Sequence, residues 1–177
     1  MATSTSHLPI DAYLHSSFEP DAEYVDGEIQ ERSVGELEHA AWQRAIQKWF
    51  FLREQEWGIR VFVELRVQVS PSRFRVPDVV VLENTGDLRA MEQIVHTPPV
   101  AVFEILPPED THSRLMQKLY DYESMGVRSI FVIEPDANTG RKYQFESGSL
   151  KLADTVTVSA HGHAHDFKLS EFEQFFN

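Results

Sequence analysis

Cysteine is absent from the 177 residues of this sequence. Its absence excludes a disulfide scaffold and a thiolate-ligated metal site, and it fits a reducing compartment such as the cytoplasm. Long hydrophobic runs are also missing, since none approaches the roughly 18 apolar residues that a membrane-spanning helix needs. The first residues lack the basic stretch and apolar core of a secretory signal. We therefore expect a cytoplasmic protein without a membrane partner.

Positive charge is scarce in the chain. Lys and Arg number 16 against 28 Asp and Glu, which gives a net charge of −12. Phosphate contacts supply most of the affinity of non-specific nucleic-acid binding, so this balance argues against such binding. It does not exclude a nucleic-acid enzyme with segregated charge. Residues 58–75 carry a local charge of +3, from Arg60, Arg66, Arg73 and Arg75 against Glu64. This segment forms either a positive rim beside a site or the solvated face of a hairpin.

The remaining composition is that of an ordinary globular protein, with 42% apolar and 25% charged residues. The length suits one compact unit, so we expect a single domain over residues 1–177. Helical periodicity predicts helices at 6–14, 36–57, 111–125 and 170–177. Strands are predicted at 59–69, 76–82, 100–106, 127–134, 141–146 and 151–158. Asp26-Gly27 predicts a hairpin turn, and the strict alternation over 59–69 predicts one long strand paired with 76–82.

Two of the predicted buried strands each contain one carboxylate. Asp78 opens the apolar run of RVPDVVVL, and Glu104 lies inside PPVAVFEIL, 26 residues later. An ionised side chain in a dry strand costs several kcal/mol unless it is paired or bound to a cation, so the two positions indicate a site. Lys118 lies on the apolar stripe of the helix at 111–125 and is expected to be the positive partner. The alternative is a lysine that only covers apolar surface with its stem.

Histidines are candidates at two places. His39 begins the inward face of the helix at 36–57, which Trp42, Ile46 and Trp49 continue. It is either a hydrogen-bonded core histidine or a ligand or proton carrier at the mouth of the site. His161, His163 and His165 alternate, so on a strand they would share one face at metal-ligand spacing. We expect them to be solvated, with a metal site as the alternative.

These segments, in this order, resemble the Uma family of restriction-endonuclease-like bacterial proteins within the PD-(D/E)xK nuclease superfamily. The residues that carry the resemblance are EYVDGEI, a helix opening with His39, RVPDVVVL, PPVAVFEIL, QKLYDYESMGV, SIFVIEPD and DFKLSEFEQFF. The resemblance implies a restriction-endonuclease-like α/β fold, with a central mixed sheet flanked by helices. It also implies a Mg²⁺-dependent endonuclease that hydrolyses DNA phosphodiester bonds. The superfamily's lysine would be Lys118 on the following helix, because the usual position holds Leu106.

The chemistry of such a site can be stated from these residues. Asp78, Glu104 and the backbone carbonyl of Ile105 offer hard oxygen ligands that suit Mg²⁺ or Mn²⁺. Lys118 would orient the attacking hydroxide or neutralise developing charge. His39, and with less weight Glu64 and Glu36, are candidate extra ligands or proton carriers. If only a cation holds Asp78 and Glu104 together, neutralising Asp78 should not destabilise the metal-free protein. Because cutting both DNA strands needs two such sites, we expect a homodimer.

Two positions depart from the family pattern and support an alternative function. Arg114 stands where an aspartate is usual, and Pro107 stands where a serine is usual. The alternative is a catalytically degenerate protein of the same fold that serves as a nucleic-acid-binding or protein-interaction module. A metal-dependent hydrolase with a substrate other than nucleic acid is a third possibility.

Overall fold

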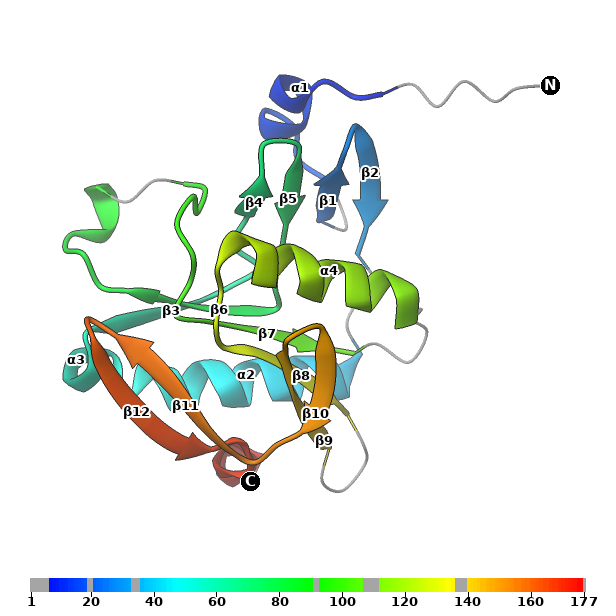
Figure 1. Cartoon of the computed structure of the whole chain (residues 1–177). Coiled ribbons are helices and arrows are strands. Elements are labelled where there is room, and N and C mark those ends of the chain that lie inside the picture. The colour runs from blue at the N-terminus through cyan, green and yellow to red at the C-terminus, as the bar shows by residue number, and fades with distance from the viewer. Residues whose placement is uncertain are drawn as a thin grey trace.

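The computed structural model describes residues 7–18, 21–32, 36–90, 93–106, 112–135 and 140–176 (Figure 1). In chain order its elements are α1 (Ile10–Leu14), β1 (Ala22–Val25), β2 (Glu28–Glu31), α2 (Leu37–Phe51), α3 (Glu54–Trp57), β3 (Ile59–Val63), β4 (Val67–Ser70), β5 (Arg73–Arg75), β6 (Val79–Glu83), η1 (Leu88–Ala90), β7 (Ala101–Ile105), α4 (His112–Met125), β8 (Ile130–Glu134), β9 (Arg141–Glu146), β10 (Ser149–Leu152), β11 (Thr155–Ala160), β12 (His163–Lys168) and η2 (Leu169–Phe175). None of the helices among these residues is long and apolar enough to cross a membrane.

A six-stranded mixed sheet forms the centre of the molecule, in the order β10-β9-β8-β7-β6-β3. Neighbouring strands of this sheet pair antiparallel, except that β7 and β8 pair parallel. Parallel neighbours need a crossover connection, and α4 supplies it here. The expected mixed sheet flanked by helices is therefore confirmed.

Both faces of this sheet are covered, which explains why its central strands are almost entirely apolar, with Glu104 of β7 as an exception. On one face, α2 packs with the β11-β12 hairpin and η2 around Trp49, Phe50, Phe103 and Phe131. On the other face, α4 packs against Val80, Val102 and Val132 of three neighbouring strands. In Figure 1, α2 and α4 lie on opposite sides of the strands. Alternate residues of β6 and β7 therefore point toward α4.

A second, four-stranded antiparallel sheet has the order β2-β1-β5-β4 and holds α1 through Tyr13. The predicted Asp26-Gly27 turn joins β1 to β2, and both residues have the positive φ that such a turn requires. This sheet also overturns the single strand expected over 59–69. The chain breaks at Glu64, where φ is 54°. β3 then pairs with β6 in the large sheet, whereas β4 pairs with β5 in the small one.

Other boundaries also differ from those expected. The helix predicted at 36–57 is two helices, α2 and α3, and the second ends at Gly58 with φ at 64°. The strand expected at 151–158 is divided between β10 and β11. The C-terminal helix is a 3-10 helix, η2. Pro107, a departure from the family pattern, lies outside the described residues.

Candidate active site

Asp78 and Glu104 lie at the same end of two adjacent strands. The antiparallel pairing of β6 with β7 matches Val79 with Phe103, so the next position along brings Asp78 opposite Glu104. Val80 and Val102, two residues away on each strand, face α4. Because side chains alternate along a strand, both carboxylates belong to the face that α4 covers. Both are buried, with 3% of Asp78 and 4% of Glu104 exposed.

Asp78 has a protein donor at each carboxylate oxygen. Oδ1 accepts a hydrogen bond from Arg32 Nη2 at 2.5 Å and lies 3.2 Å from His39 Nε2. Oδ2 accepts one from the backbone N–H of Ile105 at 2.7 Å. Burial raises the pKa of Asp78, but the hydrogen bond from His39 and the charges of Arg32 and Lys118 outweigh it and lower the pKa overall. Asp78 is therefore ionised.

Glu104 is held by two side chains of α4. Lys118 Nζ donates to Oε2 at 2.7 Å, and the Tyr122 hydroxyl donates to Oε1 at 2.7 Å. Burial raises the pKa of Glu104 to about 7, because the negative charges of Asp78 and Glu23 add to it and Lys118 offsets only part. The pKa of Lys118 is raised despite its burial, because three carboxylates surround it. The site thus combines one acid whose pKa is lowered with one whose pKa is raised to about 7.

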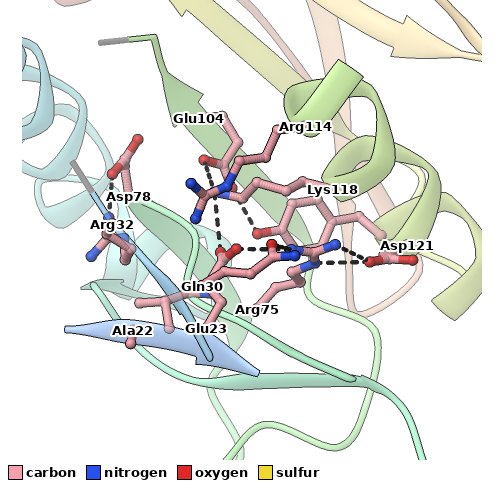
Figure 2. A network of polar contacts seen from close by, with 12 residues as sticks. Ala22, Glu23, Gln30, Arg32, Arg75, Asp78, Glu104, Arg114, Lys118 and Asp121 are labelled. Atoms are coloured by element: carbon pink, nitrogen blue, oxygen red, sulfur yellow. Dashed lines mark hydrogen bonds and ion pairs between the residues drawn. The ribbon is translucent and has the colours of Figure 1, made fainter. Parts of the chain in front are cut away.

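Glu23 of β1 is the third buried carboxylate, with 1% of the residue exposed. Its Oε1 lies 3.1 Å from Lys118 Nζ, and its Oε2 accepts from Arg75 Nη1 at 2.9 Å. Arg75 is completely buried and also donates through Nε to Asp121 of α4 at 2.8 Å. Figure 2 shows this chain of contacts running from Glu104 through Lys118, Glu23 and Arg75 to Asp121. The small sheet and α4 together therefore fix the position of Lys118.

A small cavity of about 40 Å³ opens beside these groups. That volume is enough for one or a few water molecules or a partly hydrated ion, since a water needs roughly 10–15 Å³ measured in this way. Its polar lining residues are Glu23, Arg32, His39, Asp78, Glu104, Arg114 and Lys118. Arg114 belongs to the first turn of α4, and its Nη2 donates to the backbone carbonyl of Glu31 at 2.6 Å. The cavity is thus lined by three carboxylates and by three cationic side chains, together with His39.

The structure brings together the four side chains that the sequence predicts. Asp78, Glu104, Lys118 and His39 all line the cavity, and Ile105 lines it as well. Of the residues given less weight, Glu64 contacts Arg32 at 3.5 Å, whereas Glu36 is exposed at the start of α2.

Sequence reasoning missed Arg32, Glu23 and Tyr122. Glu23 lies in the EYVDGEI segment that carries the family resemblance, so that segment was an available signal. Tyr122 shares the helix stripe of Lys118, which was another. Arg32 follows a polar hairpin strand and gave no signal of its own.

The arginines of 58–75 form neither the expected positive rim nor a solvated hairpin face. Arg73 contacts Asp26 and Asp121, Arg75 is buried against Glu23, and Arg60 donates to Asn84. Ion pairs and hydrogen bonds within the protein therefore engage much of this positive charge.

The C-terminal histidines do not form the row that alternation suggested. His161 lies in the turn before β12, with φ at 49°, and its ring nitrogen Nε2 contacts the carbonyl of Gly58. His163 is exposed, and His165 stacks on Trp57 with ring centroids 4.4 Å apart. Among the described residues, no group of three His, Cys, Asp or Glu is already arranged to hold a metal ion.

Comparisons with known proteins identify the relatives of this chain. A crystal structure of a putative nuclease belonging to DUF820, from Anabaena variabilis ATCC 29413, superposes with a TM-score of 0.75. The two chains are 19% identical, and the match covers 96% of this chain and 99% of that one, which shows a shared fold. No curated protein matches the sequence. The model of the Uma2 family, described as "Putative restriction endonuclease", matches residues 10–167. The protein therefore belongs to the Uma2 family.

Proposed function

We propose that this protein is a metal-dependent endonuclease that hydrolyses phosphodiester bonds of DNA. The observation that carries the proposal is the convergence of Asp78, Glu104 and Lys118 at one small cavity. Two carboxylates from adjacent strands and a lysine from the next helix form the set that the family resemblance implies. The membership of the chain in a family described as "Putative restriction endonuclease" supports the same activity.

The donor set fits a hard divalent cation. Asp78 and Glu104 supply carboxylate oxygens, and the carbonyl of Ile105 completes the proposed ligands for Mg²⁺ or Mn²⁺. Four buried carboxylates, those of Glu23, Asp78, Glu104 and Asp121, outnumber the two buried cations, Arg75 and Lys118, which leaves room for further positive charge beside Glu104. When bound, the cation would lower the pKa of a coordinated water and stabilise charge on the phosphate. Arg32 occupies Oδ1 of Asp78 in this structure and would compete with a metal ion for that oxygen.

The side chains around this position can each perform a distinct task. Lys118 is held at Nζ by Glu104 and Glu23, so its ammonium can orient a water or neutralise a phosphate oxygen without reorganising. His39 Nε2 faces Asp78 and can pass a proton to or from the cavity. Arg114 lies at the cavity with its guanidinium anchored on one backbone carbonyl, and its remaining N–H groups can contact phosphate.

Plasmid nicking tests this function. With Mg²⁺ or Mn²⁺ the wild type should convert supercoiled DNA to the nicked form, and EDTA should stop it. Glu104→Gln and Lys118→Met should each lower the rate at least about a hundredfold, because both remove charge at the reacting phosphate. Glu146→Gln removes an exposed carboxylate of β9 and is the matched control. Equal nicking by the wild type and Glu104→Gln would reject this site.

A second function is favoured by one specific observation. Both oxygens of Asp78 and of Glu104 already have protein donors, as expected for a degenerate site kept for its fold. Such a protein would serve as a nucleic-acid-binding or protein-interaction module. Calorimetric titration with Mn²⁺ separates the two functions, because a degenerate site should release no heat with the wild type or with Asp78→Ala.

The proposed function also has a consequence for the oligomeric state of the protein. We infer that one domain acts as a homodimer, because cleavage of both DNA strands requires two sites. Sedimentation that shows only monomer at micromolar concentration would contradict the dimer and leave single-strand nicking possible.

A further inference from the structure

Arg32 forms a largely buried ion pair with one of the carboxylates proposed to bind the metal. Its Nη2 lies 2.5 Å from Asp78 Oδ1, and the two side chains are only 13% and 5% exposed. Figure 2 shows this contact apart from the network around Glu104. The guanidinium therefore lies on one of the two Asp78 oxygens at which a divalent cation could bind. Two positive charges on one buried oxygen repel strongly, so Arg32 and a metal ion cannot both occupy it.

A second acceptor for Arg32 lies at the rim of the same site. Its Nη1 is 3.5 Å from Glu64 Oε1, and the Glu64 side chain is 49% exposed. Gln43 connects the same two places, because its Nε2 donates to the backbone carbonyl of Asp78 at 3.0 Å and lies 3.5 Å from Glu64. Glu64 also has a φ of 54°, an unfavourable value for a residue other than glycine. Such backbone strain persists where the surrounding structure holds a residue in place.

We propose that Arg32 is a displaceable internal counter-ion of the metal site, which leaves Asp78 for Glu64 when a divalent cation binds. The proposal rests on the proposed function, because it assumes that the cation binds Asp78. In the metal-free protein Arg32 compensates the buried charge of Asp78. In the metal-bound protein the cation does so, and Glu64 receives the guanidinium. Arg32 is then a positioning residue that sets the metal concentration at which the site fills.

Competition from Arg32 should lower the affinity of the site for a metal ion. A site that is open to metal for only a fraction of the time binds with an affinity reduced by that fraction. Removing Arg32 should remove this competition, so Arg32→Gln should lower the Kd for Mn²⁺ by about tenfold or more. Arg89→Gln makes the same charge change far from the cavity lining, at an exposed arginine paired with Asp87, and should leave the Kd within about twofold of wild type.

A double-mutant cycle tests whether Glu64 accepts the displaced guanidinium of Arg32. Glu64→Gln should weaken Mn²⁺ binding by about threefold to tenfold in the wild-type background, because the displaced guanidinium then loses its acceptor. In the Arg32→Gln background the same change should have almost no effect. Glu64 is half-exposed, so this variant should fold even if Arg32→Gln is less stable.

Calorimetry with Mn²⁺ on these variants, with thermal melts to establish that each is folded, decides the proposal. Tighter binding by Arg32→Gln and a Glu64 effect that depends on Arg32 would support it. Equal binding by wild type and Arg32→Gln would overturn the displacement and leave the metal site standing. An equal loss from Glu64→Gln in both backgrounds would show direct action on the metal and would also overturn it. If no variant binds Mn²⁺, the proposed function fails and the displacement fails with it.

Discussion

At the scale of single residues, the site balances buried charges one against another. Asp78 is paired with Arg32, Glu104 with Lys118, and Glu23 with both Lys118 and Arg75. Taking a charge out of water costs several kcal/mol, and these contacts offset the cost only while both members are present. The loss of either member leaves the other charged and unpaired inside the protein.

Neutralising Asp78 should therefore destabilise the metal-free protein. Asp78→Asn keeps the shape but leaves the buried guanidinium of Arg32 without its charged partner, so we expect a loss of about 3 kcal/mol in the free energy of unfolding. The sign is opposite to that expected for two carboxylates held together by a cation alone. Urea denaturation in EDTA measures it, with Asp87→Asn as an exposed control. A variant as stable as wild type would show that the Arg32 contact contributes nothing.

The raised pKa of Glu104 predicts a pH dependence of stability. The group titrates near 7 when folded, against an ordinary value of 4.5, so between these values the folded state binds more protons than the unfolded state. Stability should accordingly fall as pH rises from 4.5 to 7, by roughly 3 kcal/mol from this group. Glu104→Gln lacks the group and should lack this part of the slope.

Unfolding of wild type and Glu104→Gln at several pH values between 4.5 and 8 measures the difference. Parallel stability curves for the two proteins would mean that Glu104 keeps an ordinary pKa.

At the scale of elements, Arg75 joins the small sheet to α4. It lies on β5 and contacts Glu23 of β1 and Asp121 of α4, with none of its side chain exposed. These contacts hold the helix that carries Lys118 against the strand that carries Glu23. The position of Lys118 thus depends on residues outside the cavity.

Arg75→Met should cost about 3–5 kcal/mol of stability, because it leaves Glu23 and Asp121 buried without this partner. Arg73→Met is the matched control on the same strand. Its side chain is 29% exposed and contacts Asp26 and Asp121, so its loss should cost about 1 kcal/mol or less. Denaturant unfolding of both variants makes the comparison, and equal losses would contradict a special role for Arg75.

The strands and helices could be predicted where a pattern reports burial directly. β6, β7 and α4 were found because continuous apolar runs and a helical stripe indicate coverage by other elements. For residues 59–69 the sequence pattern does not decide between one strand and two. Their alternation gives the same pattern whether the strand continues in one sheet or passes into another at Glu64. Only the partner strands β6 and β5, chosen through tertiary contacts, decide between the two.

The candidate site follows the same division. Asp78, Glu104 and Lys118 could be found because a charge among apolar neighbours is an anomaly that needs a partner. Arg32 could not, since it follows a hairpin strand rich in polar residues where a charge is ordinary. Glu23 could be found only through the EYVDGEI segment that carries the family resemblance. Their burial results from α4 and the large sheet packing beside the hairpin, which local sequence does not contain.

At the scale of the whole molecule, the negative charge works against DNA binding. The net charge is −12, and internal partners take up arginines of 58–75. Affinity for phosphate must then come from a few groups at the cavity, such as Arg114 and Lys118, and from a bound cation. Metal and DNA are thus expected to bind at the same place.

Asp78 and Glu104 together are expected to hold a divalent metal ion. Anomalous diffraction from crystals soaked in Mn²⁺ tests it most directly, because it locates the ion itself. We predict a peak between the two carboxylates, at about 2.1–2.2 Å from an oxygen of each, with the Arg32 guanidinium moved from Asp78 toward Glu64. A fully soaked crystal with no peak there, and with Arg32 still on Asp78, would contradict it.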